Sequence, residues 1–76
     1  MYKTSTLNIA AALISEGYRL NGSEPGDKPK QKIFIIDCTP EEGDKFAVDY
    51  LNGDLMVNLK AFSDAIRTLK SYLYDY

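Results

Sequence analysis

The sequence predicts a small α+β domain in which a sheet of three or four strands packs with three helices. Residues 33–36 are four consecutive apolar residues, three of them β-branched, a run too short for a helix and typical of a central strand apolar on both faces. Residues 39–42 combine a capping box with proline at the first helical position, which predicts a helix start. Residues 59–74 carry apolar side chains at spacings of three and four, the pattern of an amphipathic helix.

Length and composition limit the function classes. The 76 residues leave room for one hydrophobic core, and a hydrophobic content of 45% excludes a disordered chain. The net charge is −2, so no general attraction to nucleic acid is expected. A metal is not expected in a chain without histidine, and a cofactor is not expected because the sequence has no phosphate-binding pattern. Cys38 is the single cysteine, which indicates a reducing, cytoplasmic location. The apolar run 9–14 is too short for a signal peptide core or a membrane span.

The first elements are a short strand over residues 2–4 and a helix over about 6–16, with Ser5 in the position of the N-cap. This helix is apolar around most of its circumference. It is therefore either the most buried helix of the domain or a helix with one face, including Ile9 and Leu13, in contact with another molecule.

A second strand is predicted over residues 18–20, after Gly17 ends the helix. Residues 21–31 contain two glycines and two prolines but no large apolar residue, which predicts a mobile loop. This loop joins the second strand to the central strand as a long hairpin. Its length is explained either by a function or by a tolerated insertion.

The helix that starts at residue 40 is expected to end at Gly53, a residue suited to positive φ, and Gly43 is expected to loosen its first turn. Its predicted buried stripe is Phe46, Ala47, Tyr50 and Leu51.

The last elements are a short edge strand over residues 55–57 and the helix over 59–74. Asn58 is predicted to cap this helix, and Val57 and Phe62 have the spacing of a hydrophobic staple. The predicted apolar face of the helix is Leu59, Phe62, Ala65, Ile66, Leu69, Tyr72 and Leu73. The full order is then β-α-β-β-α-β-α, whose first six elements match the ferredoxin-like order with the third strand central. An irregular three-stranded sheet is the alternative.

Two candidate sites for chemistry lie where the central strand meets the next helix. Asp37, Glu41 and Glu42 could hold a cation or act in acid/base catalysis, but the capping box and the helix dipole explain acids at this place. Cys38 could be a nucleophile near a helix N-terminus, but the usual histidine base is absent and a small buried residue is the simpler interpretation. We therefore predict no catalytic residue.

Two candidate binding surfaces remain. The first is the basic hairpin, where lysines and arginine could follow a phosphate backbone beside stacking tyrosines, or could simply protect an edge strand. Its residues are Arg19, Lys28, Lys30 and Lys32. The second is the tail, where Tyr74 and Tyr76 exceed the needs of the core and are either part of an interface, including one with a second copy, or a frayed end.

The pattern as a whole resembles a family of short domains of unknown function found in bacteria, phages and mobile elements. The matching positions are Tyr2-Lys3-Thr4-Ser5, Gly17-Tyr18, Phe34, Tyr50-Leu51-Asn52-Gly53, Val57, Phe62 and Leu69-Lys70. Thr6 departs from the family, in which an acid is expected after the opening serine. The resemblance implies a fold and an origin, and it supplies no catalytic residues.

The functional expectation is a non-enzymatic, cytoplasmic binding module of phage or mobile-element origin that acts through protein contacts. The alternative is a weak single-stranded nucleic-acid-binding protein that uses the basic hairpin.

Overall fold

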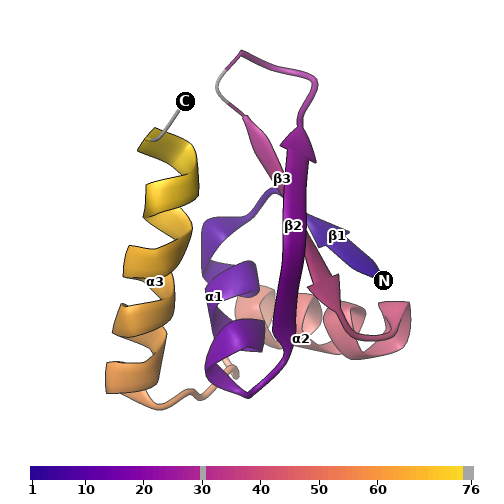
Figure 1. Ribbon diagram of the computed structural model, residues 1–76. Helices are drawn as coiled ribbons and strands as arrows, with labels where there is room; N and C mark the ends of the chain where they lie inside the picture. The colour runs from indigo at the N-terminus through magenta and orange to yellow at the C-terminus, as the bar shows by residue number, and fades with distance from the viewer. Residues whose placement is uncertain (30, 75–76) are drawn as a thin grey trace.

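The computed structural model describes residues 1–29 and 31–74, and for residues 73 and 74 only the backbone. The elements in chain order are β1 (Tyr2–Thr4), α1 (Leu7–Ser15), β2 (Arg19–Pro25), β3 (Lys32–Asp37), α2 (Pro40–Asn52) and α3 (Leu59–Tyr74). The predicted α+β class, with three helices in the described part of the chain, is confirmed (Figure 1).

The sheet has the order β1-β3-β2, and β3 is antiparallel to both neighbours. β1, α1 and β2 therefore form a split βαβ unit, with β3 inserted between the two outer strands. The prediction that residues 33–36 form the central strand is confirmed.

The two faces of β3 have different environments. Phe34 and Ile36 are completely buried on the face that α1 covers. Ile33 and Ile35 alternate with them on the opposite face and are only half-buried. The strand is thus apolar on both faces, as predicted, but the helices cover one of them.

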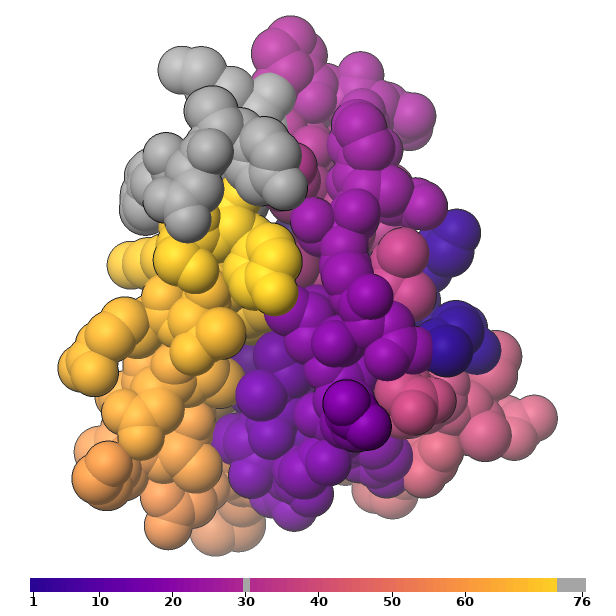
Figure 2. All heavy atoms as spheres, in the orientation of Figure 1, coloured from indigo at the N-terminus to yellow at the C-terminus, as the bar shows by residue number. Residues whose placement is uncertain are grey.

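α1 is the most buried helix in the described chain. It lies between α2 and α3 and contacts both, and its residues from Ile9 to Leu13 are buried (Figure 1). Side chains of α3 and of the α1–β2 segment lie against one another, as Figure 2 shows from the same side. The helix begins after Thr6 and not after Ser5, because the Thr4 hydroxyl accepts a hydrogen bond from the Thr6 N–H at 3.1 Å and fixes the turn.

The prediction of a loop over residues 21–31 is wrong for its first half. Residues 21–25 belong to β2, which continues past a register shift between Leu20 and Gly22 and pairs with β3 as far as Pro25. The polar composition of residues 21–25 predicts a loop, but backbone pairing with β3 makes them a strand. The turn itself is short, and the Gly26 N–H donates to the Gln31 carbonyl at 2.9 Å across it.

The strand predicted over residues 55–57 does not form, so the described sheet has three strands and the complete ferredoxin-like order is not reached. The predicted helix ends on either side are confirmed. Gly53 ends α2 in the left-handed region at φ 75°, and the Asn58 side chain accepts from the Ala61 N–H at 2.9 Å at the start of α3. Residues 54–58 therefore connect two capped helices.

Candidate functional site

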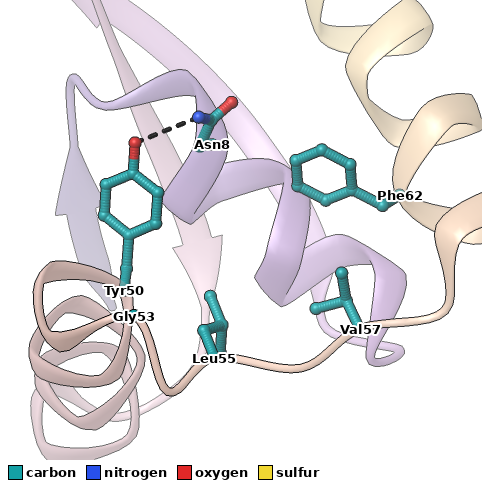
Figure 3. A pocket seen from close by; sticks show the side chains of 6 residues that line it. All are labelled: Asn8, Tyr50, Gly53, Leu55, Val57 and Phe62. Carbon is teal, nitrogen blue, oxygen red and sulfur yellow. Dashed lines mark hydrogen bonds between the residues drawn. The ribbon is translucent and has the colours of Figure 1, made fainter.

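The connection between α2 and α3 lines a groove of about 290 Å³, which we call the α2–α3 groove. α1 contributes one side, α2 another and α3 a third (Figure 3). The lining residues are Asn8, Tyr50, Gly53, Leu55, Val57 and Phe62.

Local sequence explains how the connection builds this groove. Gly53 adopts the positive φ that turns the chain away from α2. Leu55 and Val57 then line the groove, whereas Met56 between them is 86% exposed. This alternation is the pattern of an extended chain, so residues 55–57 have the side-chain periodicity of the predicted strand without a sheet partner.

The groove has one polar end and one apolar end. The Asn8 side-chain amide donates to the Tyr50 hydroxyl at 3.0 Å, which leaves the Tyr50 hydroxyl proton to donate to a ligand. Phe62, Leu55 and Val57 form the apolar remainder (Figure 3). Small-molecule sites typically measure about 300–1,000 Å³. The α2–α3 groove is at the lower limit of that range and fits one large apolar side chain better than a cofactor.

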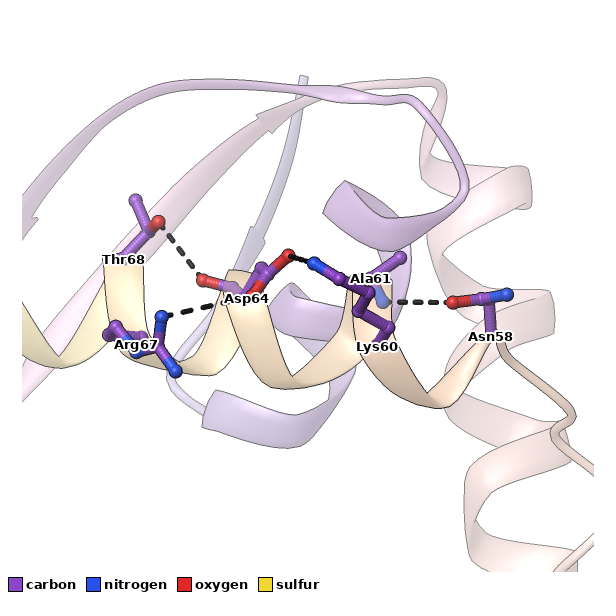
Figure 4. Close-up of polar contacts among 6 residues, drawn as sticks. All are labelled: Asn58, Lys60, Ala61, Asp64, Arg67 and Thr68. Carbon is purple, nitrogen blue, oxygen red and sulfur yellow. Dashed lines mark hydrogen bonds and ion pairs between the residues drawn. The ribbon is translucent and has the colours of Figure 1, made fainter.

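A second, more open depression of about 500 Å³ lies along α3, and Phe62 lines both it and the groove. We call it the α3 shelf, and its residues are Leu59, Phe62, Ser63, Ile66, Arg67 and Lys70. Beside the shelf, one carboxylate oxygen of Asp64 accepts a hydrogen bond from the Lys60 ammonium at 3.1 Å, and the other oxygen lies 3.9 Å from a guanidinium nitrogen of Arg67. Both contacts are drawn in Figure 4. The shelf therefore combines apolar contact area with two cations.

Three large apolar side chains near the groove are strongly exposed. Leu51 is 80% exposed, Met56 86% and Leu59 77%, all within nine residues of sequence. The predicted burial of Leu51 and Leu59 is wrong, because each lies in the terminal turn of its helix, beyond the part that packs on the core. Isolated exposed apolar residues are ordinary, so what distinguishes these three is that they lie within nine residues of sequence next to groove-lining residues.

Two of the partner-binding residues proposed from the sequence, Ile9 and Leu13, are not at this surface. Ile9 is 6% exposed and Leu13 is completely buried, so both belong to the core and not to an interface. The apolar circumference of α1 is explained by the helices and sheet around it. Tyr76 and the side chain of Tyr74 lie outside the described residues.

The three basic hairpin residues that the structure describes do not form one patch. Arg19 begins β2, whereas Lys28 lies in the turn at its other end and Lys32 begins β3 beside that turn. At about 3.3 Å per residue, the seven residues of β2 separate Arg19 from that turn by roughly 20 Å. Lys30 lies outside the described residues.

The carboxylate of Glu42 has a structural role. The Thr39 N–H donates to it at 2.9 Å and the Tyr18 hydroxyl at 2.6 Å, and the Thr39 hydroxyl accepts from the Glu42 N–H at 3.1 Å. The hydrogen bond from Tyr18, followed by that from Thr39, holds the pKa of the Glu42 carboxyl below its usual value. The same bond raises the pKa of Tyr18. The predicted capping box is confirmed, and the hydrogen bond from Tyr18 also joins α2 to the residue just before β2.

The lowered pKa predicts an acid-dependent loss of stability. A group whose pKa is lower in the folded state stabilises the fold at pH values above its unfolded pKa, about 4.3 for glutamate, and this stabilisation is lost as pH falls through the folded pKa. We expect the stability difference between the wild type and Glu42→Gln to shrink as pH falls from about 5 to about 3, measured by urea unfolding. Glu41→Gln is the matched control, because Glu41 makes no hydrogen bond to a described residue. A difference that is independent of pH for Glu42→Gln would contradict the assignment.

The remaining reactive candidates are also explained by the fold. Cys38 is buried, and burial, followed by the charge of Glu42, raises the pKa of its thiol, which opposes formation of a nucleophilic thiolate. Among residues 1–29 and 31–74, no group of three or more acidic or cysteine side chains could hold a metal ion. Within the same residues, none of the helices has the length and apolar character that crossing a bilayer requires.

Comparison with known proteins gives a family without an assigned activity. No curated protein and no solved structure matches the chain. One family model matches residues 1–75, nearly the whole length. The chain therefore belongs to the family described as a domain of unknown function (DUF5659).

Proposed function

We propose that this domain is a non-enzymatic binding module that recognises another protein through the α2–α3 groove and the α3 shelf. The observation that carries the proposal is the position of the groove beside the exposed Leu51, Met56 and Leu59. Protein interfaces concentrate their binding energy in a few large side chains that enter well-packed pockets. A groove for one side chain, surrounded by apolar residues and followed by a charged shelf, has this arrangement.

The chemistry of the groove favours binding over catalysis. Its polar side chains are the Asn8 amide and the Tyr50 phenol, which are hydrogen-bonded to each other. Neither has the adjacent base that an activated nucleophile requires. The perturbed groups Glu42 and Cys38 are accounted for by the helix cap and by burial. We place the module in the cytoplasm of a bacterium carrying a phage or mobile element, on the basis of the single cysteine and the family pattern.

A photo-crosslinking residue at position 56 tests the proposal in cells that express the full chain. Met56 is strongly exposed between two groove-lining residues, so its replacement leaves the core unchanged and places the probe at the opening of the groove. We expect discrete crosslinked protein species after irradiation. Phe62→Asp in the same chain should reduce them at least tenfold, because a carboxylate cannot replace the apolar wall.

The matched control places the same probe at Lys28, in the hairpin turn far from the groove in sequence. It should give no crosslink that depends on Phe62. Because Phe62 also packs against the core, the folding of Phe62→Asp is verified by circular dichroism, and Leu59→Asp, at an exposed shelf position, serves as the second variant. Crosslinks that are absent at position 56, or equal at both positions, would contradict the proposal.

A further inference from the structure

The outer face of α2 carries an unpartnered stripe of two acids and two apolar residues. Glu41, Asp44, Val48 and Leu51 recur at spacings of three, four and three, which places them on one side of the helix. Val48 is 54% exposed and Leu51 80%, and both acids are exposed. Within the described residues, neither Glu41 nor Asp44 takes part in an ion pair. We call these four residues the α2 stripe.

The α3 shelf has the complementary pattern. Its apolar end is Leu59, and its cations Arg67 and Lys70 follow eight and eleven residues later, or about 12 and 16 Å along the helix. Lys70 is in no ion pair with a described residue, and Arg67 has only the distant Asp64 at 3.9 Å. Both cations are therefore available to a partner.

The spacings of the two surfaces match. From Leu51 at the apolar end of the α2 stripe, Asp44 and Glu41 lie seven and ten residues back, or about 10 and 15 Å. When the two helices run antiparallel, the distances of the charges from the apolar ends therefore agree to within about 2 Å. In that register Asp44 faces Arg67 and Glu41 faces Lys70.

Building on the function proposed above, we propose that the protein partner is a second copy of this chain, whose α2 stripe lies antiparallel on the α3 shelf. Leu51 of one copy then contacts Leu59 and Phe62 of the other, at the opening of the α2–α3 groove. Every copy carries both halves of the contact, so no other component is needed.

The two types of contact have different roles. Exposed ion pairs contribute only about 0–1 kcal/mol each, so the charges set the direction and register of the helices, while burial of Leu51, Val48 and Leu59 supplies most of the affinity. Two geometries satisfy the contact. In a two-fold dimer each copy places its α2 stripe on the α3 shelf of the other. In a head-to-tail arrangement each copy binds the next one, and the assembly is an open filament.

Charge reversal with mixing tests the pairing, with sedimentation of the full chain over a range of concentrations as the measurement. The wild type should associate, and the shelf variant Arg67→Glu/Lys70→Glu should sediment as one chain at the same concentrations, because reversal replaces each ion pair by a repulsive like-charge contact. The stripe variant Glu41→Lys/Asp44→Lys should do the same. An equimolar mixture of the two variants should associate again, because each then offers the surface that the other lacks. Raising the salt concentration should weaken the wild-type association.

Two further variants keep the test decisive. Lysine at position 41 opposes the dipole of α2, so Leu51→Lys, at an exposed position in the last turn, reports on the stripe if the double variant is poorly folded by circular dichroism. Arg19→Glu/Lys28→Glu changes the net charge by the same amount away from the shelf and should associate as the wild type does.

A wild type that stays a single chain at every concentration overturns the inference. So does association that survives both charge reversals, or a mixture that does not associate. Crosslinking from position 56 to a different protein, in a chain that does not self-associate, would retain the proposed function and overturn only the identity of the partner.

Discussion

Phe34→Ala is expected to lower the free energy of unfolding by roughly 3–5 kcal/mol. Phe34 is 1% exposed on the central strand and is among the largest fully buried side chains of the core. Its removal loses apolar burial and leaves a cavity between β3 and α1, which the rigid pairing of β3 with two strands prevents from closing. A chain of this size has a total stability of about 5–15 kcal/mol, so the variant should lose much of its resistance to urea.

Ile35→Ala is the matched control for this prediction. Ile35 is the next residue on the same strand and faces the opposite side of the sheet, where an ion pair of 3.2 Å between Lys3 and Glu24 joins the two outer strands. Ile35 is only half-buried, so its truncation should cost about 1 kcal/mol. If both variants lost the same free energy of unfolding, the two faces of the sheet would be equally buried, which would contradict the description of a sheet covered by helices on one face.

Features that depend on neighbouring residues were predictable from the sequence. The capping box at Thr39 and Glu42, the left-handed Gly53 and the Asn58 cap each use groups within three or four residues of one another. The central strand was predictable because a run of four apolar residues, three of them β-branched, is too short for a helix and typical of a buried strand. Such patterns contain their own physical explanation.

Features that depend on distant residues were not predictable from composition. Residues 21–25 carry no large apolar side chain, and they form a strand because their backbone groups exchange hydrogen bonds with β3. Residues 55–57 have strand-like alternation, but Leu55 and Val57 line a groove between helices instead of joining the sheet. In both cases the partner decides the structure, and the local sequence does not identify the partner.

The candidate site was missed for the same reason. Asn8 and Tyr50 meet across 42 residues of sequence, and nothing near either residue indicates the other. The Val57 and Phe62 staple was the available signal, because it places two apolar residues at a helix start. The sequence pattern indicated α1 instead, whose residues from Ile9 to Leu13 are buried in the core.

Gly43 shows how a tertiary contact reverses a local expectation. Helix propensity alone predicts that Gly43→Ala stabilises α2 by about 1 kcal/mol. In the structure Gly43 is buried and the ring of Tyr2 lies directly against it, so that a Cβ at this position would overlap the ring. The glycine therefore lets β1 approach the first turn of α2, and that turn is closely packed and not loose as expected from the sequence.

Gly43→Ala is accordingly expected to destabilise the protein by roughly 1–3 kcal/mol, because the Tyr2 ring must leave its place or α2 must shift. In a Tyr2→Ala background the obstacle is absent, and the same substitution should stabilise by up to about 1 kcal/mol through helix propensity. Urea unfolding of the wild type, both single variants and the double variant measures this reversal as a coupling energy between the two positions. A stabilising Gly43→Ala in the wild-type background would mean that the Tyr2 ring does not occupy the space beside the helix, and that β1 and α2 are held together by other contacts.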